Sequence, residues 1–269
     1  MYRLIATDID DTILSPDGTL PETNRQALER LHSRGIAVVL SSGRATVSMQ
    51  TVAAGILPPA DDEYLISFNG ARVSTLLSGH ILFEKVLSPA TVKAVMEYAR
   101  AEGLLVQGYP REDGFITERR DRKSDIYTRE TGMPYKVVPD LPEALPEGSP
   151  KLLIIDDPET LPTHQKRLRE LAEGTFDVLS SKRHYLEIVP AGVSKGDALI
   201  RLAEHLEIPI EETIAVGDSL NDVEMLRAAG LGVAVANARS ELKTVADVVL
   251  ERTAADGAIA EVEERFWGA

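Results

Sequence analysis

Short apolar runs alternate with helical stretches at both ends of this 269-residue chain. The apolar runs cover 4–8, 37–41, 64–68, 214–216, 232–235 and 247–250. The helical stretches cover 21–33, a segment that starts at 45, 195–206, 222–229 and 240–245. Alternation of this kind predicts a doubly wound parallel sheet with helices on both faces. The expected fold class is therefore α/β.

The middle of the chain has a different pattern. Two helical runs, 89–102 and 158–173, lie among short strand-like runs, and helix breakers cluster between Pro139 and Pro150. The strand-like runs cover 105–109, 114–117, 136–139, 152–156, 176–180 and 185–189. We therefore expect an inserted α+β domain over 85–188, with the doubly wound core formed by 1–84 and 189–269.

Composition excludes several kinds of site and partner. The chain has no cysteine, which excludes disulfides, thiolate nucleophiles and sulfur-ligated metals, and its 5 histidines are scattered without ligand spacing. Oxygen ligands then point to magnesium as the metal. A net charge of −14 disfavours nucleic acid and anionic membranes as partners, so an anionic small substrate needs a locally positive pocket. Because the chain lacks a basic-plus-apolar leader and an apolar run of about 18 residues, we expect a cytoplasmic protein.

The first strand runs directly into three carboxylates, Asp8, Asp10 and Asp11. Like charges repel and carboxylates resist leaving water, so this cluster must face solvent, bind a cation or hold a proton. One carboxylate can attack as a nucleophile while another moves a proton, and aspartate nucleophiles form aspartyl-phosphates. Taken alone, the same residues are equally compatible with an acidic turn that caps backbone amides.

Two further segments place a cation at an expected helix start. Ser42 and Gly43 can hold a phosphate oxygen through a hydroxyl and backbone amides, although Ser42 alone is also compatible with a helix cap. Arg44 in the first helical turn opposes the helix dipole, so a nearby anion would rationalise it. Lys195 raises the same question, and it either faces phosphate and Asp8 or lies on the surface as a solvated lysine.

A second acidic strand end follows the apolar run at 214–216. Asp218 can supply a carboxylate to magnesium, while Asn221 and Asp222 lie at the next helix start. Helix capping explains part of this pattern but not both acids together. Because ligands of such sheets bind beyond the carboxyl ends of the strands, we expect Asp8, Ser42 and Asp218 to converge.

These four segments, in this order, resemble the signature motifs of the haloacid dehalogenase superfamily. The motifs are D-x-D-x-T from Asp8, S-G-R from Ser42, S-K-G around Lys195 and G-D-S-x-N-D from Gly217. The long insertion is similar to the large cap of the Cof-type, sugar-phosphatase-like subgroup. Further matches are F-N-G-A at 68–71, Y-L-E-I at 185–188, G-V-A at 232–234, N-A at 237–238 and D-G at 256–257. Two departures are Asp11, at a position that is often glycine, and the absence of a methionine from 234–237.

The resemblance implies a Rossmann-like catalytic core and a cap domain that sets substrate specificity. It implies a magnesium-dependent phosphatase of small phosphorylated metabolites, sugar phosphates above all, with Asp8 as nucleophile and Asp10 as general acid/base. For Asp10 to hold a proton near neutrality, its pKa must rise by about 2 to 3 from about 3.9. The implied phosphate ligands are Ile9, Ser42, Gly43, Lys195 and Asn221. The implied magnesium ligands are Asp8, Asp218 and the carbonyl of Asp10, and Asp222 would support the site. Apart from the resemblance, Arg44 is a further supporting or substrate-contacting candidate, and Asn69, at the end of an expected core strand, is a candidate for contacting the substrate or the closed cap.

Two other functions stay open: a phosphotransferase or mutase, in which a sugar hydroxyl replaces water, and a phosphoaspartate switch or binding module. Substrate choice is expected to lie in the inserted domain, whose cations either bind a second anionic group or form a solvated charged face. These cations are Arg111, Arg119, Arg120, Arg122 and Lys123. We expect a monomer or a small homo-oligomer.

Overall fold

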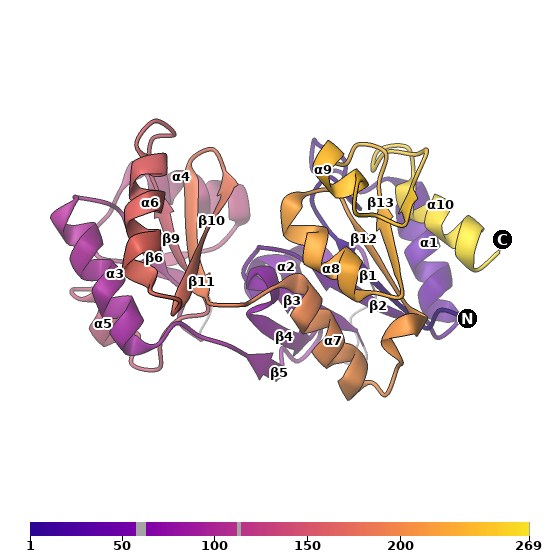
Figure 1. The fold of residues 1–269 in the computed structure, drawn as a ribbon, viewed down its shortest axis with the longest axis horizontal. Coiled ribbons are helices and arrows are strands. Elements are labelled where there is room, and N and C mark those ends of the chain that lie inside the picture. Colours follow the sequence, from indigo (N-terminus) through magenta and orange to yellow (C-terminus); the bar gives the residue numbers. More distant parts are fainter. Residues whose placement is uncertain (58–62, 112–113, 269) are drawn as a thin grey trace. The chain divides into compact units, whose positions relative to one another are not determined.

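The structure, a computed structural model, describes residues 1–57, 63–111 and 114–268 (Figure 1). The chain divides into two compact units, which we call the core unit (1–83 and 194–269) and the inserted unit (84–193). The inserted unit extends beyond the expected end at 188, because strand β11 (Tyr185–Pro190) pairs with two other strands of that unit. Among the described residues, no helix is both long enough and apolar enough to span a membrane.

The core unit is built on an 8-stranded sheet in the order β14-β13-β12-β1-β2-β3-β4-β5. Its strands are β1 (Leu4–Asp8), β2 (Ala37–Ser41), β3 (Tyr64–Ser67), β4 (Arg72–Thr75), β5 (Ile81–Glu84), β12 (Thr213–Gly217), β13 (Leu231–Ala234) and β14 (Val248–Val249). The strands from β14 to β3 pair in parallel, as the alternating pattern predicts. Strand β4 instead runs antiparallel to β3. The short turn between β3 and β4 cannot hold the crossover that parallel pairing requires, so the sheet is mixed at this end.

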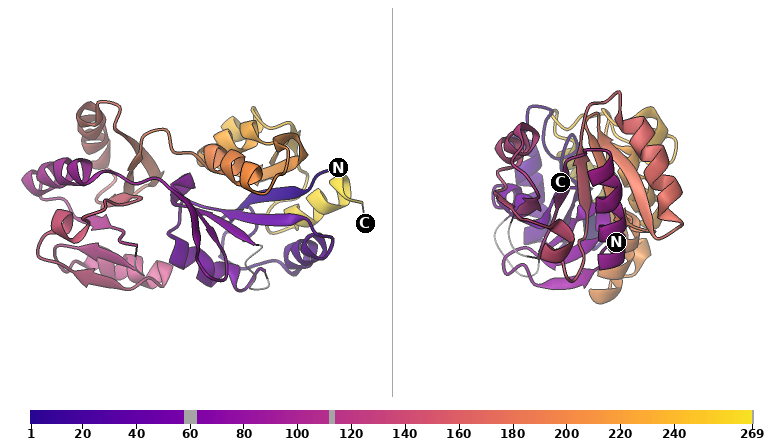
Figure 2. Two further views of the ribbon diagram at one scale, coloured as in Figure 1. Left: turned by 90° about the horizontal axis from the view of Figure 1, so that it is seen from below. Right: turned by 90° about the vertical axis from the view of Figure 1, so that its left-hand side faces the viewer.

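Helices cover both faces of the core sheet, which confirms the α/β fold class. They are α1 (Glu22–Ser33), α2 (Thr46–Ala53), α7 (Lys195–His205), α8 (Val223–Ala228), α9 (Ser240–Lys243) and α10 (Ala258–Phe266). Figure 2 shows α1 and α2 on one face and the orange and gold helices of the C-terminal half on the other. Strand β1 is buried along its whole length, including the carboxylate of Asp8 at its carboxyl end. Helix α10 packs against α1 and was not expected from the sequence.

The inserted unit contains a 6-stranded sheet in the order β10-β11-β9-β6-β7-β8. Its other strands are β6 (Val106–Gly108), β7 (Phe115–Thr117), β8 (Tyr135–Val137), β9 (Leu152–Ile155) and β10 (Phe176–Lys182). Helices α3 (Pro89–Ala101) and α6 (Leu161–Ala172) share one apolar cluster with alternate residues of the strands, including Val106, Ile154 and Ile188. This α+β arrangement agrees with the two helical runs and the short strands expected there.

Two helices of the inserted unit were not expected. Helix α4 (Arg122–Thr131) begins where Asp121 accepts a hydrogen bond from the Lys123 amide, and it ends at Gly132, whose φ is 71°. Its sequence is mostly polar, so it carries little of the apolar periodicity that indicates a helix. The short helix α5 (Leu141–Ala144) lies in the proline-rich loop, where Asp140 caps it and Pro142 occupies its first turn.

Candidate active site

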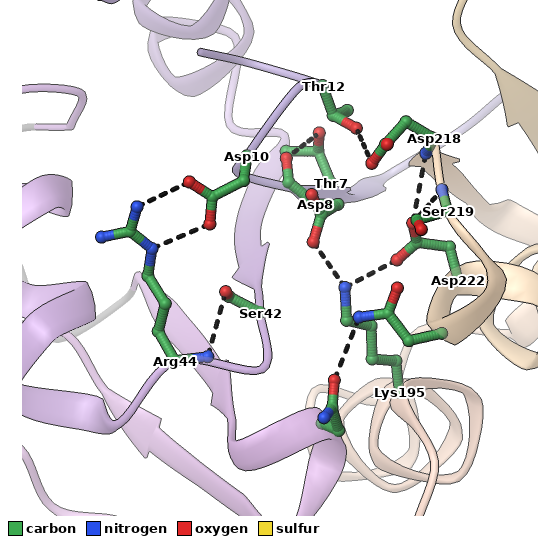
Figure 3. A network of polar contacts seen from close by, with 12 residues as sticks. Thr7, Asp8, Asp10, Thr12, Ser42, Arg44, Lys195, Asp218, Ser219 and Asp222 are labelled. Carbon is green, nitrogen blue, oxygen red and sulfur yellow. Dashed lines mark hydrogen bonds and ion pairs between the residues drawn. The ribbon is translucent and has the colours of Figure 1, made fainter. Parts of the chain in front are cut away.

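The carboxyl ends of three neighbouring strands bring the acidic segments together (Figure 3). Asp8 is the last residue of β1 and pairs in register with Ser41 of β2. Asp218 follows directly after β12, which pairs with β1 on its other side. Because all three strands are parallel, residues distant in sequence meet at one edge of the sheet, with Ser42 directly after β2.

Lys195 lies at the centre of this cluster and is completely buried. It is the first residue of α7, and Ser194 caps the helix by accepting a hydrogen bond from the Asp197 amide. The Lys195 ammonium donates to Asp8 Oδ1 at 2.5 Å and to Asp222 Oδ1 at 2.6 Å. These contacts exclude the interpretation of Lys195 as a solvated surface lysine, and the two carboxylates stabilise a cation at an unfavourable end of the helix dipole.

Asp222 combines a capping role with an electrostatic one. It ends a 3-10 turn, η3 (Leu220–Asp222), and its Oδ2 accepts from the amides of Asp218 at 3.1 Å and Ser219 at 3.0 Å. Ser219 and Asp222 together form a capping box. Since the other oxygen of Asp222 accepts from Lys195, one carboxylate fixes both the Asp218 loop and the lysine.

The cluster carries more negative than positive charge, and the titration of its members reflects this. Burial raises the pKa of Asp8 well above its ordinary value; the Lys195 charge opposes that shift, and the charges of Asp222 and Asp218 add to it. Burial, reinforced by the charge of Asp222, raises the pKa of Asp218 to about 7, although the Thr12 hydroxyl and Lys195 oppose the shift. Burial alone would lower the pKa of Lys195, but Asp222 and Asp8 outweigh it and raise that pKa.

The donor set fits a hard divalent cation. Carboxylate oxygens of Asp8, Asp218 and Asp222 lie within 4.8 Å of one another. Both oxygens of Asp222 already accept hydrogen bonds, so Asp8 and Asp218 are the better placed ligands. Magnesium usually takes one or two carboxylates and keeps several waters, which agrees with this pair. The carbonyl of Asp10 as a third ligand stays a prediction.

Arg44 and Ser42 lie outside the helix in which we expected them. Helix α2 begins at Thr46 with Ala45 as its cap, so the expectation of Arg44 in a first helical turn and of Ser42 as a helix cap is wrong. The reason is that the Ser42 amide donates to Ile66 and extends the strand pairing, while its hydroxyl accepts from the Arg44 amide at 3.2 Å.

The anion beside Arg44 is the carboxylate of Asp10. The guanidinium donates from Nε to Asp10 Oδ2 at 2.8 Å and from Nη2 to Oδ1 at 2.5 Å. This two-pronged contact is the strong form of an arginine–carboxylate pair. Asp10 itself is exposed, and the proton that we expect it to hold stays a prediction.

Asn69 and Asn221, which come from two different motifs, contact each other. The Asn221 amide nitrogen donates to Asn69 Oδ1 at 3.0 Å. Asn69 lies in the turn η1 (Phe68–Gly70) between β3 and β4, and its amide lies beside Gly43. This turn therefore lies at the candidate site, where the sequence suggested only a contact with substrate or cap.

Two further residues belong to the site but were assigned no role from the sequence. Thr12 is buried and its hydroxyl donates to Asp218 Oδ1 at 3.2 Å. Asn237 donates to the carbonyl of Asp11 at 2.7 Å and accepts from the Ala254 amide at 2.9 Å, so it ties down the loop after β1. Both residues lie within motifs that carry the family resemblance, and this membership was the sequence signal that could have identified them.

Asp11, which stands at a position that is often glycine, adopts a backbone conformation that favours glycine. Its φ is 59°, in the left-handed region that asparagine and aspartate tolerate better than most residues. This conformation explains why glycine suits the position, and it shows how aspartate can replace it. The contact of Asp11 with Asn237 uses only its backbone carbonyl.

Several cations of the inserted unit are held in local polar contacts. Arg111 pairs with Glu147 at 2.9 Å and Glu84 at 3.2 Å, and Lys123 pairs with Asp156 at 2.6 Å. Arg119 donates to the carbonyl of Gly103 at 3.0 Å. Arg120 lines a surface cavity with Asp125, Tyr135, Lys136 and Val137. The paired cations fit the expectation of a solvated charged face.

The chain is similar to known proteins along almost its whole length. Residues 5–262 match the family model described as haloacid dehalogenase-like hydrolase. An HMP-PP phosphatase from Cronobacter sakazakii is 32% identical over 244 residues, which cover 90% of this chain and 87% of that protein. A crystal structure of a Thermotoga maritima protein superposes with a TM-score of 0.89 at 33% identity, covering 99% of this chain and 98% of the other. A haloacid dehalogenase-like hydrolase from Bacteroides thetaiotaomicron gives a TM-score of 0.91 at 29% identity, with 98% and 99% covered.

Proposed function

The chain belongs to the haloacid dehalogenase-like hydrolases, in the Cof-type subgroup, and is a phosphatase; from this premise we propose that it hydrolyses small phosphorylated metabolites with magnesium, through an aspartyl-phosphate on Asp8. The observation that carries the proposal is the buried cluster in which Lys195 bonds both Asp8 and Asp222 beside Asp218. Lys195, together with a magnesium ion held by the carboxylates, would supply the local positive charge that an acidic protein needs to bind a phosphate ester.

Asp8 is the proposed nucleophile. It ends a buried strand, and its Oδ1 is fixed by Lys195, so its position is set before substrate binds. In the first step a carboxylate oxygen of Asp8 bonds to phosphorus while the bond from phosphorus to the ester oxygen breaks. Because the Asp8 carboxylate is held in place, little reorganisation is needed at the moment of attack.

The transferring phosphoryl group is proposed to lie among the ends of three strands. Ser42 offers a buried hydroxyl and Lys195 a buried ammonium, and the backbone amides of Ile9 and Gly43 would complete the set of donors. Asn221 would add an amide donor from the opposite loop. Donors fixed in this way favour the charge that builds on the equatorial oxygens.

Asp8 and Asp218, with the carbonyl of Asp10, would hold the magnesium ion. When bound, magnesium neutralises charge on these carboxylates and on the phosphoryl oxygens. Asp222 would keep the Asp218 loop in place through the amides of Asp218 and Ser219. Thr12 would fix one oxygen of Asp218 in the same way.

Asp10 is the proposed general acid and base. It gives its proton to the leaving alcohol in the first step, and it takes a proton from the water that hydrolyses the aspartyl-phosphate in the second. Both of its oxygens accept from Arg44 in the structure, which fixes the orientation of the carboxyl group and leaves each oxygen a second lone pair for a proton. We propose that Arg44 holds Asp10 in place between turnovers.

The inserted unit, proposed as the cap, would set substrate choice, because the four motif segments handle only the phosphoryl group. The relatives named HMP-PP phosphatase make HMP-PP one candidate substrate, beside the sugar phosphates that the motifs suggest. A panel of both kinds, with nucleotides and phosphoglycolate added, should be assayed for phosphate release with magnesium. Substrates that differ only in the alcohol should then differ in KM and kcat.

The test of the proposal compares two identical substitutions in the same acidic cluster. Asp8→Asn should abolish phosphate release, whereas Asp11→Asn should keep it, since Asp11 is exposed and asparagine also tolerates its positive φ. Retention of wild-type turnover in Asp8→Asn would sink the assignment. Reaction in ¹⁸O-labelled water separates hydrolysis, which labels the phosphate, from transfer to a sugar hydroxyl. A phosphoenzyme that persists for minutes would instead indicate a switch.

A further inference from the structure

The turn between β3 and β4 has a strained backbone. Phe68, Asn69 and Gly70 all have positive φ, at 54°, 57° and 101°. Asparagine and glycine tolerate this region, but a bulky residue such as phenylalanine rarely adopts it. Strain of this kind persists only where surrounding contacts enforce it, and it is concentrated at functional sites.

Backbone hydrogen bonds tie the turn to the Ser42 segment. The amide of Phe68 donates to the carbonyl of Arg44 at 2.9 Å, and the amide of Asn69 donates to the carbonyl of Ser42 at 3.1 Å. The guanidinium of Arg72 lies 5.3 Å from the centre of the Phe68 ring and holds that side chain from β4. These contacts account for the backbone of Phe68 and Asn69.

The side chain of Asn69 joins the second motif to the fourth. A Cβ added to Gly43 would lie 3.0 Å from Asn69 Oδ1 and 3.1 Å from Nδ2, so the amide lies flat against that glycine. The same Oδ1 accepts from Asn221 at 3.0 Å. Asn69 is buried whereas Asn221 is exposed, so only the acceptor end of this hydrogen bond is shielded from water.

Gly70 joins the same turn to the third motif. A Cβ on Gly70 would lie 2.1 Å from the carbonyl oxygen of Ser194, the residue that caps the helix carrying Lys195. No side chain fits there, so the backbone of the turn rests directly on the start of α7. One short turn therefore touches the second, third and fourth motif segments.

We propose that the turn Phe68–Gly70 fixes the three phosphate-binding segments relative to one another, and that Asn69 is a positioning residue that acts through Gly43 and Asn221. The inference rests on the proposed function, since it assumes that these segments bind the transferring phosphoryl group. That group is common to all substrates. Loss of Asn69 should therefore reduce turnover by the same factor for every substrate, whereas a residue that recognises the rest of the substrate would change selectivity.

The experiment uses Asn69→Gly, Asn221→Ala and the double variant in the full-length protein. Glycine removes the amide without adding strain at positive φ. For Asn69→Gly we expect kcat/KM to fall by about 10- to 100-fold, the usual effect of losing an outer partner of a site, and by one common factor for p-nitrophenyl phosphate and two metabolites. The double variant should lose less than the product of the two single losses, because both substitutions remove the contact between Asn69 and Asn221.

The matched control is Asn24→Ala. Asn24 is a buried asparagine of α1 whose amide bonds the carbonyls of Ile13 and Ala254 and the amide of Ile259. Its loss should lower the melting temperature more than Asn69→Gly does, yet leave kcat/KM within a few-fold of wild type at 25 °C. This comparison separates a positioning effect from a general loss of stability.

Binding of inorganic phosphate with magnesium, measured by calorimetry in the same variants, gives a readout that needs no turnover. Each single variant should weaken phosphate binding, and the double variant should weaken it by less than the product of the two single losses. Losses that multiply in the double variant, losses that differ between substrates, or no loss in Asn69→Gly would each overturn the inference. If wild-type protein binds phosphate but releases none from any ester, the proposed function fails. The comparison of phosphate binding among the variants would still test the positioning role of the turn.

Discussion

Replacing Lys195 with methionine should destabilise the core unit strongly, and more at alkaline than at acidic pH. The side chain is completely buried and its ammonium is shared by Asp8 and Asp222. Removing one partner of a buried ion pair costs about 3–5 kcal/mol, because the other charge is left without compensation. At about 2–4 °C per kcal/mol for a unit of this size, the melting temperature should fall by about 6–20 °C.

The pH dependence follows from the raised pKa values of the carboxylates. The pKa of Asp218 is raised to about 7 and that of Asp8 lies above its ordinary value, so acidification neutralises Asp218 and favours the neutral form of Asp8 in the folded protein. A neutral carboxyl group needs no ammonium beside it. The decrease in stability that Lys195→Met causes should therefore be larger at pH 8 than at pH 5 when both are measured without metal.

The assay is thermal unfolding of wild type, Lys195→Met and Lys151→Met, followed by circular dichroism at both pH values. Lys151 is a matched control because it is also buried, with Glu187 at 3.3 Å, but lies in the inserted unit. Lys151→Met should lower stability without changing the shift in melting temperature that magnesium produces. A decrease in melting temperature of less than about 3 °C for Lys195→Met, or a decrease of equal size at the two pH values, would refute this account of the cluster.

Three more predictions concern the metal ligand and the proton carrier. Because burial raises the pKa of Asp218 from 3.8 to about 7, the folded protein binds more protons than the unfolded chain between these pH values, and the free energy of unfolding without metal should fall by up to about 4 kcal/mol as pH rises from about 4 to 7. Magnesium should therefore raise the melting temperature more at pH 8 than at pH 6. A larger rise at pH 6 would contradict this prediction. Thr12→Val removes a hydrogen bond that lowers the pKa of Asp218, so the magnesium concentration for half-maximal activity at pH 7 should rise several-fold, and an unchanged value would count against the ligand role. Arg44→Met should change the free energy of unfolding by less than about 1 kcal/mol, because the ion pair with Asp10 is partly exposed, but it should lower kcat about tenfold or more. Arg44→Lys should restore little activity, since an ammonium cannot bond both carboxylate oxygens in parallel. Full activity in Arg44→Met would show that Asp10 needs no such partner.

The core strands could be predicted because they are short apolar runs separated by helices. Strand β1 and its neighbours follow this pattern closely, and the family membership that the four motifs suggest is confirmed by the whole-chain match. Strand β4 was missed because Arg72–Thr75 is polar and its position depends on the strained turn before it. Helix α10 was missed because two of its glutamates are buried, Glu261 accepting from backbone amides and Glu263 pairing with Arg30.

The convergence of the acidic strand ends could also be predicted, because parallel strands bring their carboxyl ends to one edge. The partners within the site could not. Arg44 bonds Asp10 and does not lie in a helical turn, and Asp222 accepts a hydrogen bond from Lys195 as well as capping its own loop. These contacts join residues that are far apart in the chain through loop geometry, which no local pattern encodes.

The most direct test of the central claim is a search for phosphate on Asp8 during turnover. A rapid acid quench of the wild-type enzyme with substrate and magnesium, followed by mass spectrometry of its peptides, should find a phosphorylated peptide that contains Asp8 and that disappears as substrate is exhausted. Asp8→Asn should yield no such peptide and no phosphate release. Wild-type turnover with no phosphopeptide at any time, together with activity in Asp8→Asn, would contradict the account.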